Sequence, residues 1–97
     1  MSRVSGKAYF VYVLWSDTGG RFYIGISEDP QKRLEQHNSG EFRGWTSRHR
    51  PWELVYAEGH SDFGSARRRE NELKAHKGGV GFFASTGLDP LRFRRGS

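Results

Sequence analysis

The sequence predicts an α+β fold in which a small three-stranded antiparallel sheet is flanked by helices, in the order β-β-α-β-α. Three runs of β-branched and aromatic residues, at 8–15, 21–26 and 52–57, are typical of strands. Two further segments, which begin near Asp29 and Asp62, carry helix start and stop signals. A chain of 97 residues has the length of one domain, and we expect a single domain over residues 1–97.

The first two strands are expected to form a hairpin. A turn cluster of Ser, Asp, Thr and Gly separates the strand at 8–15 from the strand at 21–26. Alternation along these strands places Tyr12 on one face of the first, and Tyr23 and Gly25 together on one face of the second. Tyrosines in strands are usually structural, whereas a glycine at a strand end indicates that something approaches the backbone closely.

The first helix is predicted from Asp29, a good N-cap, and Pro30, which fits the first turn, to the stop signal at 38–40. Arg33 and His37 lie four residues apart, so their side chains emerge next to each other. A guanidinium matches the geometry of a phosphate, and a histidine can orient water or carry a proton. The alternative is an ordinary solvated helix face.

Residues 39–51 form a basic loop that interleaves arginines with a tryptophan before the third strand. Such a loop can bind a phosphate backbone and stack on a base, although an ordinary polar loop is the alternative. The residues that we expect to contact nucleic acid are Gly25, Lys32, Asn38, Arg43, Trp45, Thr46, Arg48 and Arg50.

The second helix is predicted from 61–62 to Lys77, before two glycines. Its apolar stripe consists of Phe63, Ala66 and Leu73, and Glu70 lies on that same stripe. A carboxylate on the core-facing side must be paired, protonated or bound to a metal, because burying it alone costs several kcal/mol. The alternative to a functional role is a salt bridge within the helix, to Arg67 or Lys74.

Residues 78–97 are broken by glycines and carry no clear signal for an element. We expect Phe82, Phe83 and Leu88 to pack on the core, and the arginines that follow to form a basic tail. Those arginines are Arg92, Arg94 and Arg95.

The composition favours an anionic partner. Sixteen Lys and Arg against eleven Asp and Glu give a formal charge of +5, which suits nucleic acid but also simply solubility. The absence of cysteine excludes disulfides and thiolate metal sites. No stretch has the length of a signal peptide core or a membrane span, so we expect a cytoplasmic protein without membrane contact.

Together these features resemble a GIY-YIG endonuclease domain over residues 8–77, with residues 78–97 as an extension. The family pattern has a tyrosine in a first strand, Tyr-Ile-Gly in a second, an Arg-Leu-x-x-His helix, a later strand and a glutamate on the next helix. The corresponding residues here are Tyr12, Tyr23-Ile24-Gly25, Arg33-Leu34-Glu35-Gln36-His37, Arg50-Pro51-Trp52 and Glu70. The first motif reads Phe-Val-Tyr instead of Gly-Ile-Tyr but keeps its tyrosine.

The resemblance implies a metal-dependent phosphodiesterase acting on DNA, in repair or recombination, with RNA left open. It assigns Glu70 to a single Mg²⁺ or Mn²⁺ and Arg33 to the phosphate. Tyr12 becomes the general base, its pKa lowered by Arg33 and the metal, while His37 and Tyr23 position the water and accept its proton. The alternative is a nucleic-acid-binding module on the same scaffold that does not cut, and a protein-interaction domain would explain the charge poorly.

Overall fold

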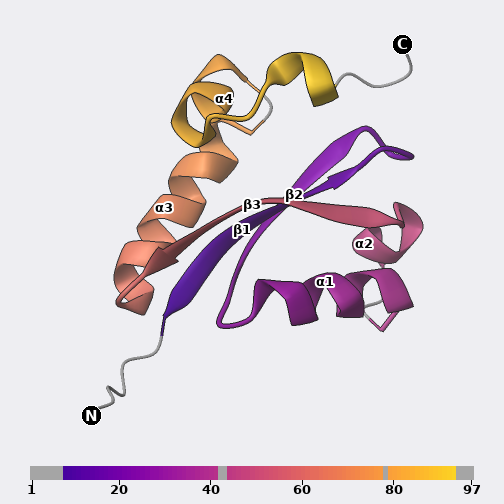
Figure 1. The fold of residues 1–97 in the computed structure, drawn as a ribbon, viewed down its shortest axis with the longest axis horizontal. Helices are drawn as coiled ribbons and strands as arrows, with labels where there is room; N and C mark the ends of the chain where they lie inside the picture. The colour runs from indigo at the N-terminus through magenta and orange to yellow at the C-terminus, as the bar shows by residue number, and fades with distance from the viewer. Residues whose placement is uncertain (1–7, 42–43, 78, 94–97) are drawn as a thin grey trace.

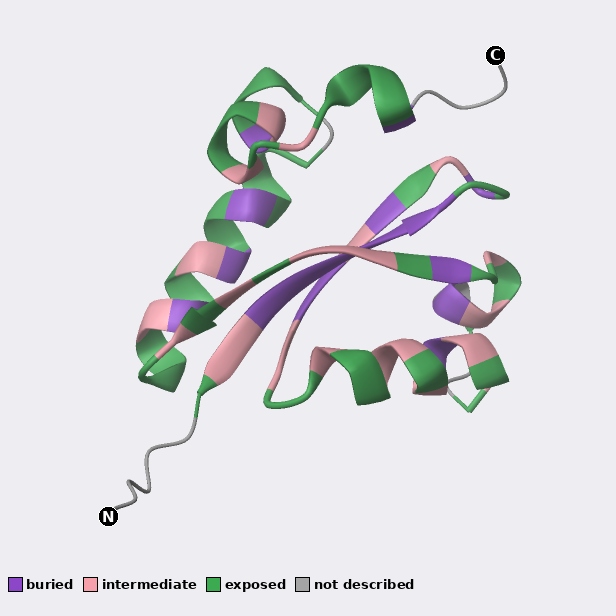
Figure 2. Cartoon of the chain, viewed as in Figure 1, coloured by how far each residue is buried: buried purple, intermediate pink, exposed green. Residues whose placement is uncertain are grey.

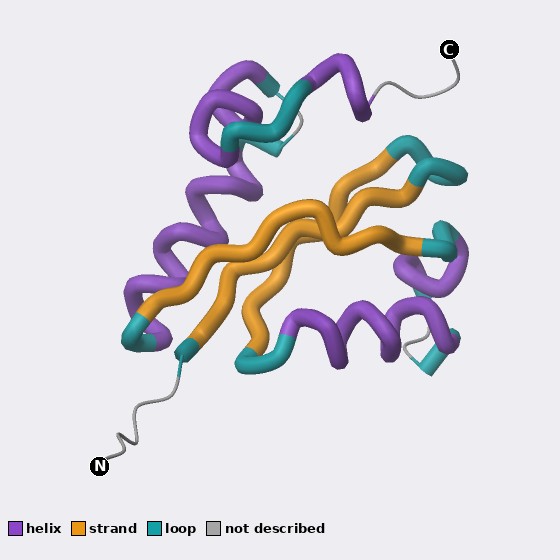
Figure 3. Tube along the Cα trace, viewed as in Figure 1, coloured by secondary structure: helices purple, strands orange, loops and turns teal. Residues whose placement is uncertain are grey.

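The computed structural model describes residues 8–41, 44–77 and 79–93. The strands form one antiparallel sheet in the order β2-β1-β3, which confirms the predicted fold class (Figures 1 and 3). No helix in these ranges is both long and apolar enough to cross a membrane. The elements in chain order are β1 (Tyr9–Ser16), β2 (Arg21–Ser27), α1 (Pro30–Ser39), α2 (Trp45–Arg48), β3 (Trp52–His60), α3 (Phe63–Ala75), α4 (Val80–Thr86) and the 3-10 helix η1 (Pro90–Phe93).

Helices cover both faces of the sheet. Figure 1 shows α3 and α4 on one side and α1 and α2 on the other. The central strand β1 is therefore buried over six consecutive residues, Val11–Ser16, as Figure 2 shows. Successive side chains of a strand point to opposite faces, so this run contributes to two separate cores.

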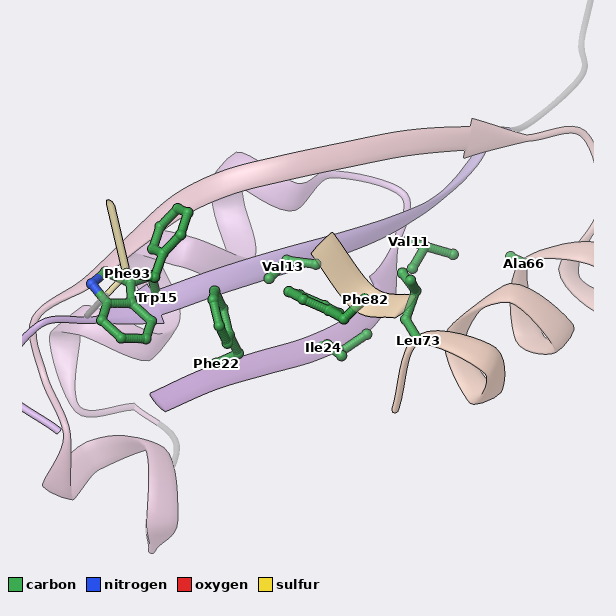
Figure 4. Packing of buried hydrophobic residues seen from close by; sticks show 9 residues of the cluster. All are labelled: Val11, Val13, Trp15, Phe22, Ile24, Ala66, Leu73, Phe82 and Phe93. Atoms are coloured by element: carbon green, nitrogen blue, oxygen red, sulfur yellow. The ribbon is translucent and has the colours of Figure 1, made fainter. Parts of the chain in front are cut away.

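The core beneath α3 and α4 contains a group of four aromatic rings, those of Trp15, Phe22, Phe82 and Phe93 (Figure 4). The ring centroid of Phe22 lies 4.8 Å from those of Trp15 and Phe82 and 5.2 Å from that of Phe93. The expected packing of Phe82, Phe83 and Leu88 on the core is confirmed. Helix α4, the 3-10 helix η1 and the burial of Phe93 were not predicted from the sequence.

Phe63 departs from the predicted apolar stripe of α3. Ala66, Glu70 and Leu73 are buried as expected, but the side chain of Phe63 is 48% exposed. It lies in the first turn of the helix, where its ring meets the edge of Tyr9 at a centroid distance of 5.8 Å instead of entering the core.

The ends of α1 are built by the predicted signals. The Asp29 carboxylate accepts a hydrogen bond from the backbone N–H of Lys32 at 3.1 Å, and Pro30 occupies the first turn. Gly40 ends the helix with φ of 85°, in the left-handed region that glycine adopts without steric cost. These caps set where α1 begins and ends, and so keep Arg33 and His37 within one regular helix.

Strand β3 continues to His60, three residues beyond the predicted end at position 57. The register with β1 shifts between Val13 and Leu14, because Val13 pairs with Tyr56 whereas Leu14 pairs with Leu54. This bulge leaves both Val55 and Tyr56 packed against the core beneath α3 and α4.

A network of hydrogen bonds and ion pairs connects α3 to the end of β3. The Nε of Arg69 donates to both carboxylate oxygens of Glu58, at 3.0 and 3.1 Å, and Arg69 also bonds Glu72 at 3.1 Å. His60 contacts the same Glu58 carboxylate at 2.7 Å, and the Tyr56 hydroxyl donates to it. Burial of Glu58 acts to raise its pKa, but the hydrogen bonds from Tyr56, His60 and Arg69 outweigh burial and lower it.

We expect Glu58→Gln to reduce the free energy of unfolding at neutral pH by about 1–3 kcal/mol, because charge-assisted hydrogen bonds are lost. The folded-state pKa of Glu58 lies below the ordinary value of 4.5, so its contribution is fully present above about pH 4.5. It is lost as pH falls through the lowered pKa. Urea unfolding of wild type and variant from neutral to acid pH should therefore show a stability difference that shrinks with acid.

Glu72→Gln is the matched control. Glu72 bonds the same arginine, but its side chain is 58% exposed, so the loss should stay within about 1 kcal/mol. Equal losses of unfolding free energy in the two variants, or a loss in Glu58→Gln that does not change with pH, would contradict the assigned role of Glu58.

Candidate active site

Tyr12 and Gly25 are direct partners across β1 and β2. The Tyr12 side chain is almost fully buried, and its ring lies against the backbone of Gly25. A Cβ atom at position 25 would lie 2.8 Å from the Tyr12 hydroxyl oxygen and 2.9 Å from Cζ, closer than such contacts occur. The close approach indicated by the sequence is thus made by the chain's own tyrosine, and contact of Gly25 with nucleic acid remains a prediction.

His37 reaches the same place from α1. It is buried, and its Nε2 lies 3.4 Å from the Tyr12 hydroxyl oxygen. The Tyr23 ring centroid lies 4.8 Å from that of His37 and 6.2 Å from that of Tyr12. Three of the five candidate catalytic residues therefore meet between α1 and the sheet, next to a small core that includes Leu14 and Trp52.

The pKa of the Tyr12 hydroxyl is raised well above its ordinary value. Burial is the main cause, followed by the neighbouring Tyr23, while Glu70 adds a smaller increase. Arg33 acts in the opposite direction but is outweighed. The expectation that Arg33 helps to lower the pKa of Tyr12 below its ordinary value is therefore wrong for the protein without a metal. The positive charge of Arg33 does not overcome the cost of burying a phenolate.

The pKa of His37 moves the other way. Burial lowers it below the ordinary value of 6.5, and the positive charge of Arg33 lowers it further. His37 is consequently neutral near pH 7 and can accept a proton. The site thus holds a protonated phenol beside a neutral imidazole.

Glu70 approaches from α3, and its charge is close enough to raise the pKa of Tyr12. Its side chain is 8% exposed, and it forms ion pairs with Lys74 at 3.1 Å and Arg67 at 3.5 Å. The salt bridges that were the alternative to a functional role are therefore present. Both cationic side chains are about half exposed, at 52% and 56%, so solvent and ligands can reach them.

The donor set suits a hard divalent cation held by one protein ligand. Within residues 8–41, 44–77 and 79–93, no group of three His, Cys, Asp or Glu side chains is placed to hold a metal. Mg²⁺ commonly binds through one or two carboxylates and completes its shell with water and substrate phosphates. Glu70, a carboxylate at the edge of the tyrosine cluster, fits that mode.

Asn38 holds the end of α1 against the start of β3. Its side-chain oxygen accepts from the backbone N–H of Trp52 at 2.6 Å, and its Nδ2 donates to the Trp52 carbonyl at 2.9 Å. Arg50 donates to the carbonyls of Ser47 at 2.9 Å and Asn38 at 3.4 Å. Both residues thus have structural partners, and their contact with nucleic acid remains a prediction.

The other residues predicted to contact nucleic acid differ in their exposure. Lys32 and Arg48 are exposed, whereas Thr46 is buried and its carbonyl accepts from Trp52 Nε1 at 2.8 Å. Arg43 and the side chain of Trp45 lie outside the described residues.

A cavity of about 350 Å³, which was not predicted from the sequence, adjoins the cluster of Tyr12, Tyr23 and His37. It is lined by Tyr23, Ile24, Lys74 and Lys77. The signal was present in the sequence, because the two lysines follow Glu70 by four and seven residues, a spacing that keeps side chains on one face of a helix.

Residues 8–79 match the GIY-YIG catalytic domain. The chain belongs to the GIY-YIG family. This family is a nuclease family whose substrates are nucleic acids and whose members generally use divalent metal ions. The resemblance drawn from the sequence is confirmed.

The GIY-YIG relatives include UPF0213 proteins of Staphylococcus aureus. Those of strains Mu3 and COL are each 35% identical over 69 residues, which cover 71% of this chain and 83% of the relative. The solution NMR structure of the UPF0213 protein BH0048 from Bacillus halodurans is 29% identical and covers 70% of this chain and 71% of that chain, with a TM-score of 0.44.

Gly25→Ala should destabilise the protein by about 1–3 kcal/mol, the range for forcing an extra group into a packed site. The added methyl must displace the Tyr12 ring, so the hydroxyl moves away from His37. Gly81→Ala is the control, because a Cβ there meets His76 at an ordinary 3.4 Å. Urea unfolding should show a loss for Gly25→Ala alone, and equal stability of Gly25→Ala and wild type would contradict the close contact.

Proposed function

We propose that this protein is a divalent-metal-dependent endonuclease that hydrolyses phosphodiester bonds in DNA, with RNA as the other candidate substrate. The observation that carries the proposal is the meeting of a buried tyrosine hydroxyl with a neutral histidine, where the charges of Arg33 and Glu70 also act. A role in repair or recombination fits this activity.

In this proposal Glu70 holds the metal and Arg33 binds the phosphate. A bound Mg²⁺ or Mn²⁺ supplies Lewis-acid stabilisation of the charge on the phosphate oxygens. For Glu70 to act as a ligand, Lys74 and Arg67 must give up its carboxylate oxygens, and their half-exposed side chains have room to do so. The guanidinium of Arg33 adds a fixed positive charge for the transition state.

Tyr12 and His37 form a proton relay in this proposal. The raised pKa keeps the Tyr12 hydroxyl protonated at neutral pH, so it becomes a base only as it gives up its own proton. The attacking water passes a proton to the Tyr12 oxygen while the phenolic proton moves to Nε2 of neutral His37, 3.4 Å away. The Tyr23 hydroxyl orients the water, and its ring packs beside the imidazole of His37.

A nucleic-acid-binding module that does not cut is the second candidate. It is favoured by the two ion pairs of Glu70, which satisfy the buried carboxylate without any metal. The response of cleavage and binding to a change at Glu70 separates the two candidates.

For the nuclease, Glu70→Gln should lower single-turnover cleavage by at least about 10²-fold, the scale for removing one group that stabilises developing charge. Affinity for DNA should be kept or improved, since a negative charge near the phosphates is gone. The assay uses labelled DNA and RNA of several structures, with and without Mg²⁺ or Mn²⁺.

Glu72→Gln, two residues along the same helix and exposed, should cleave like wild type. Full cleavage by Glu70→Gln would refute the metal-binding role, and a wild-type protein that binds but cuts no member of the panel would favour the non-cleaving module.

The relay predicts the pH profile of cleavage. His37 must be neutral, and its pKa is lowered, so the rate should hold from pH 9 down to below about 6.5 and fall only in more acid solution. Tyr12→Phe should reduce the rate by about 10²–10⁴-fold, the range for losing general acid–base help. Tyr9→Phe, on the other face of β1, serves as control. A Tyr12→Phe variant with the wild-type rate would show that the hydroxyl takes no part.

A further inference from the structure

Positive charge gathers at one end of the candidate active site. Lys74 and Lys77 line the cavity of about 350 Å³ together with Tyr23 and Ile24. The cavity lies between the edge strand β2 and the C-terminal end of α3, and Arg21 at the start of β2 adds a third cation nearby. Its volume falls in the range of about 300–1,000 Å³ for sites that bind small ligands.

The cations are close enough to act on one another. Partial burial lowers the pKa of Lys77, and the positive charges of Lys74 and Arg21 lower it further. Crowding like charges costs free energy, which an anion bound among them recovers. The cavity therefore suits a negatively charged group.

Two residues that line the cavity also contact residues of the candidate active site. Tyr23 lines the cavity, and its ring centroid lies 4.8 Å from that of His37. Lys74 lines the cavity and reaches Glu70 at 3.1 Å. A nucleic-acid strand held at Tyr12 and Glu70 thus has a space lined by Tyr23 and two lysines beside it.

We propose that the nucleic-acid strand runs from the candidate active site into this cavity, where Lys77 and Arg21 bind the backbone phosphate next to the one that is cleaved. Tyr23 offers a ring against which the intervening nucleotide packs. The inference rests on the proposed function, because the strand is positioned by the residues that would cleave it. It makes Lys77 and Arg21 substrate-binding residues.

The test measures binding without cleavage. Wild type, Lys77→Gln and Arg21→Gln are titrated with fluorescent single-stranded and duplex DNA, in EDTA, over a series of salt concentrations. Each phosphate contact contributes about −0.7 (single strand) to −0.9 (duplex) to the slope of log K against log salt concentration. Each variant should therefore weaken binding and make this slope shallower by that amount. The two arms identify which form of DNA enters the cavity.

Two further variants control for total charge and for folding. Arg68→Gln removes one charge from an exposed position on the opposite side of α3 and should leave the slope unchanged. Lys77→Arg keeps the charge and should retain the wild-type slope. The proposal is overturned if Lys77→Gln keeps the wild-type slope, if Arg68→Gln makes it shallower by the same amount, or if wild type binds neither DNA.

This titration, read together with the cleavage assay in Mg²⁺ or Mn²⁺, separates this inference from the proposed function. Binding that depends on Lys77 in a protein that never cleaves would leave the phosphate site standing and refute the nuclease. Cleavage by wild type, together with unchanged binding by Lys77→Gln and Arg21→Gln, would support the nuclease and refute the phosphate site.

Discussion

Strand β1 is covered on both faces, and the rest of the molecule is arranged around that constraint. Its alternating side chains supply the middle of two cores, one beneath α3 and α4 and one beneath α1. Tyr12 belongs to the second set, between the apolar neighbours Val11 and Val13 of the first. A slip of one residue in register would turn the hydroxyl of Tyr12 into the aromatic core. The alternation that builds the hydrophobic core therefore also presents the phenol to His37.

Burial gives the tyrosine–histidine pair its chemical character. It raises the pKa of Tyr12 and lowers that of His37, so both groups favour their neutral forms. A phenolate beside an imidazolium is costly in this environment unless other charge compensates. In the proposed reaction, proton movement between them would be coupled to the negative charge that develops on the phosphate near Arg33. Without substrate, both groups of such a site stay neutral, and no permanently ionised base is needed.

Local signals predicted the parts of the fold that local interactions build. The cap at Asp29, the end of α1 at Gly40 and the inward position of Glu70 were all readable from spacing and residue type. The extension of β3 to His60 was not predicted, because Glu58 and His60 look like turn residues in the sequence. In the fold, Glu58 bonds both His60 and the Arg69 side chain of α3. Helix α4 begins without a side-chain cap, and η1 is a single short turn that follows Asp89. Packing of their phenylalanines on β1 and β2 positions both elements. The raised pKa of Tyr12 could not be predicted from the sequence, because it depends on how deeply the folded protein buries the hydroxyl.

The double hydrogen bond between Asn38 and the backbone of Trp52 joins the end of α1 directly to the start of β3. The segment between these two residues, which includes α2, consequently has its base already closed. Lengthening a closed loop adds little entropic cost, about 0.6 kcal/mol for each doubling, and need not disturb the elements on either side. A peptide grafted into this segment apart from Thr46 and His49, whose carbonyls accept from Trp52 and Ser16, would therefore leave Arg33 and His37 in their places against the sheet.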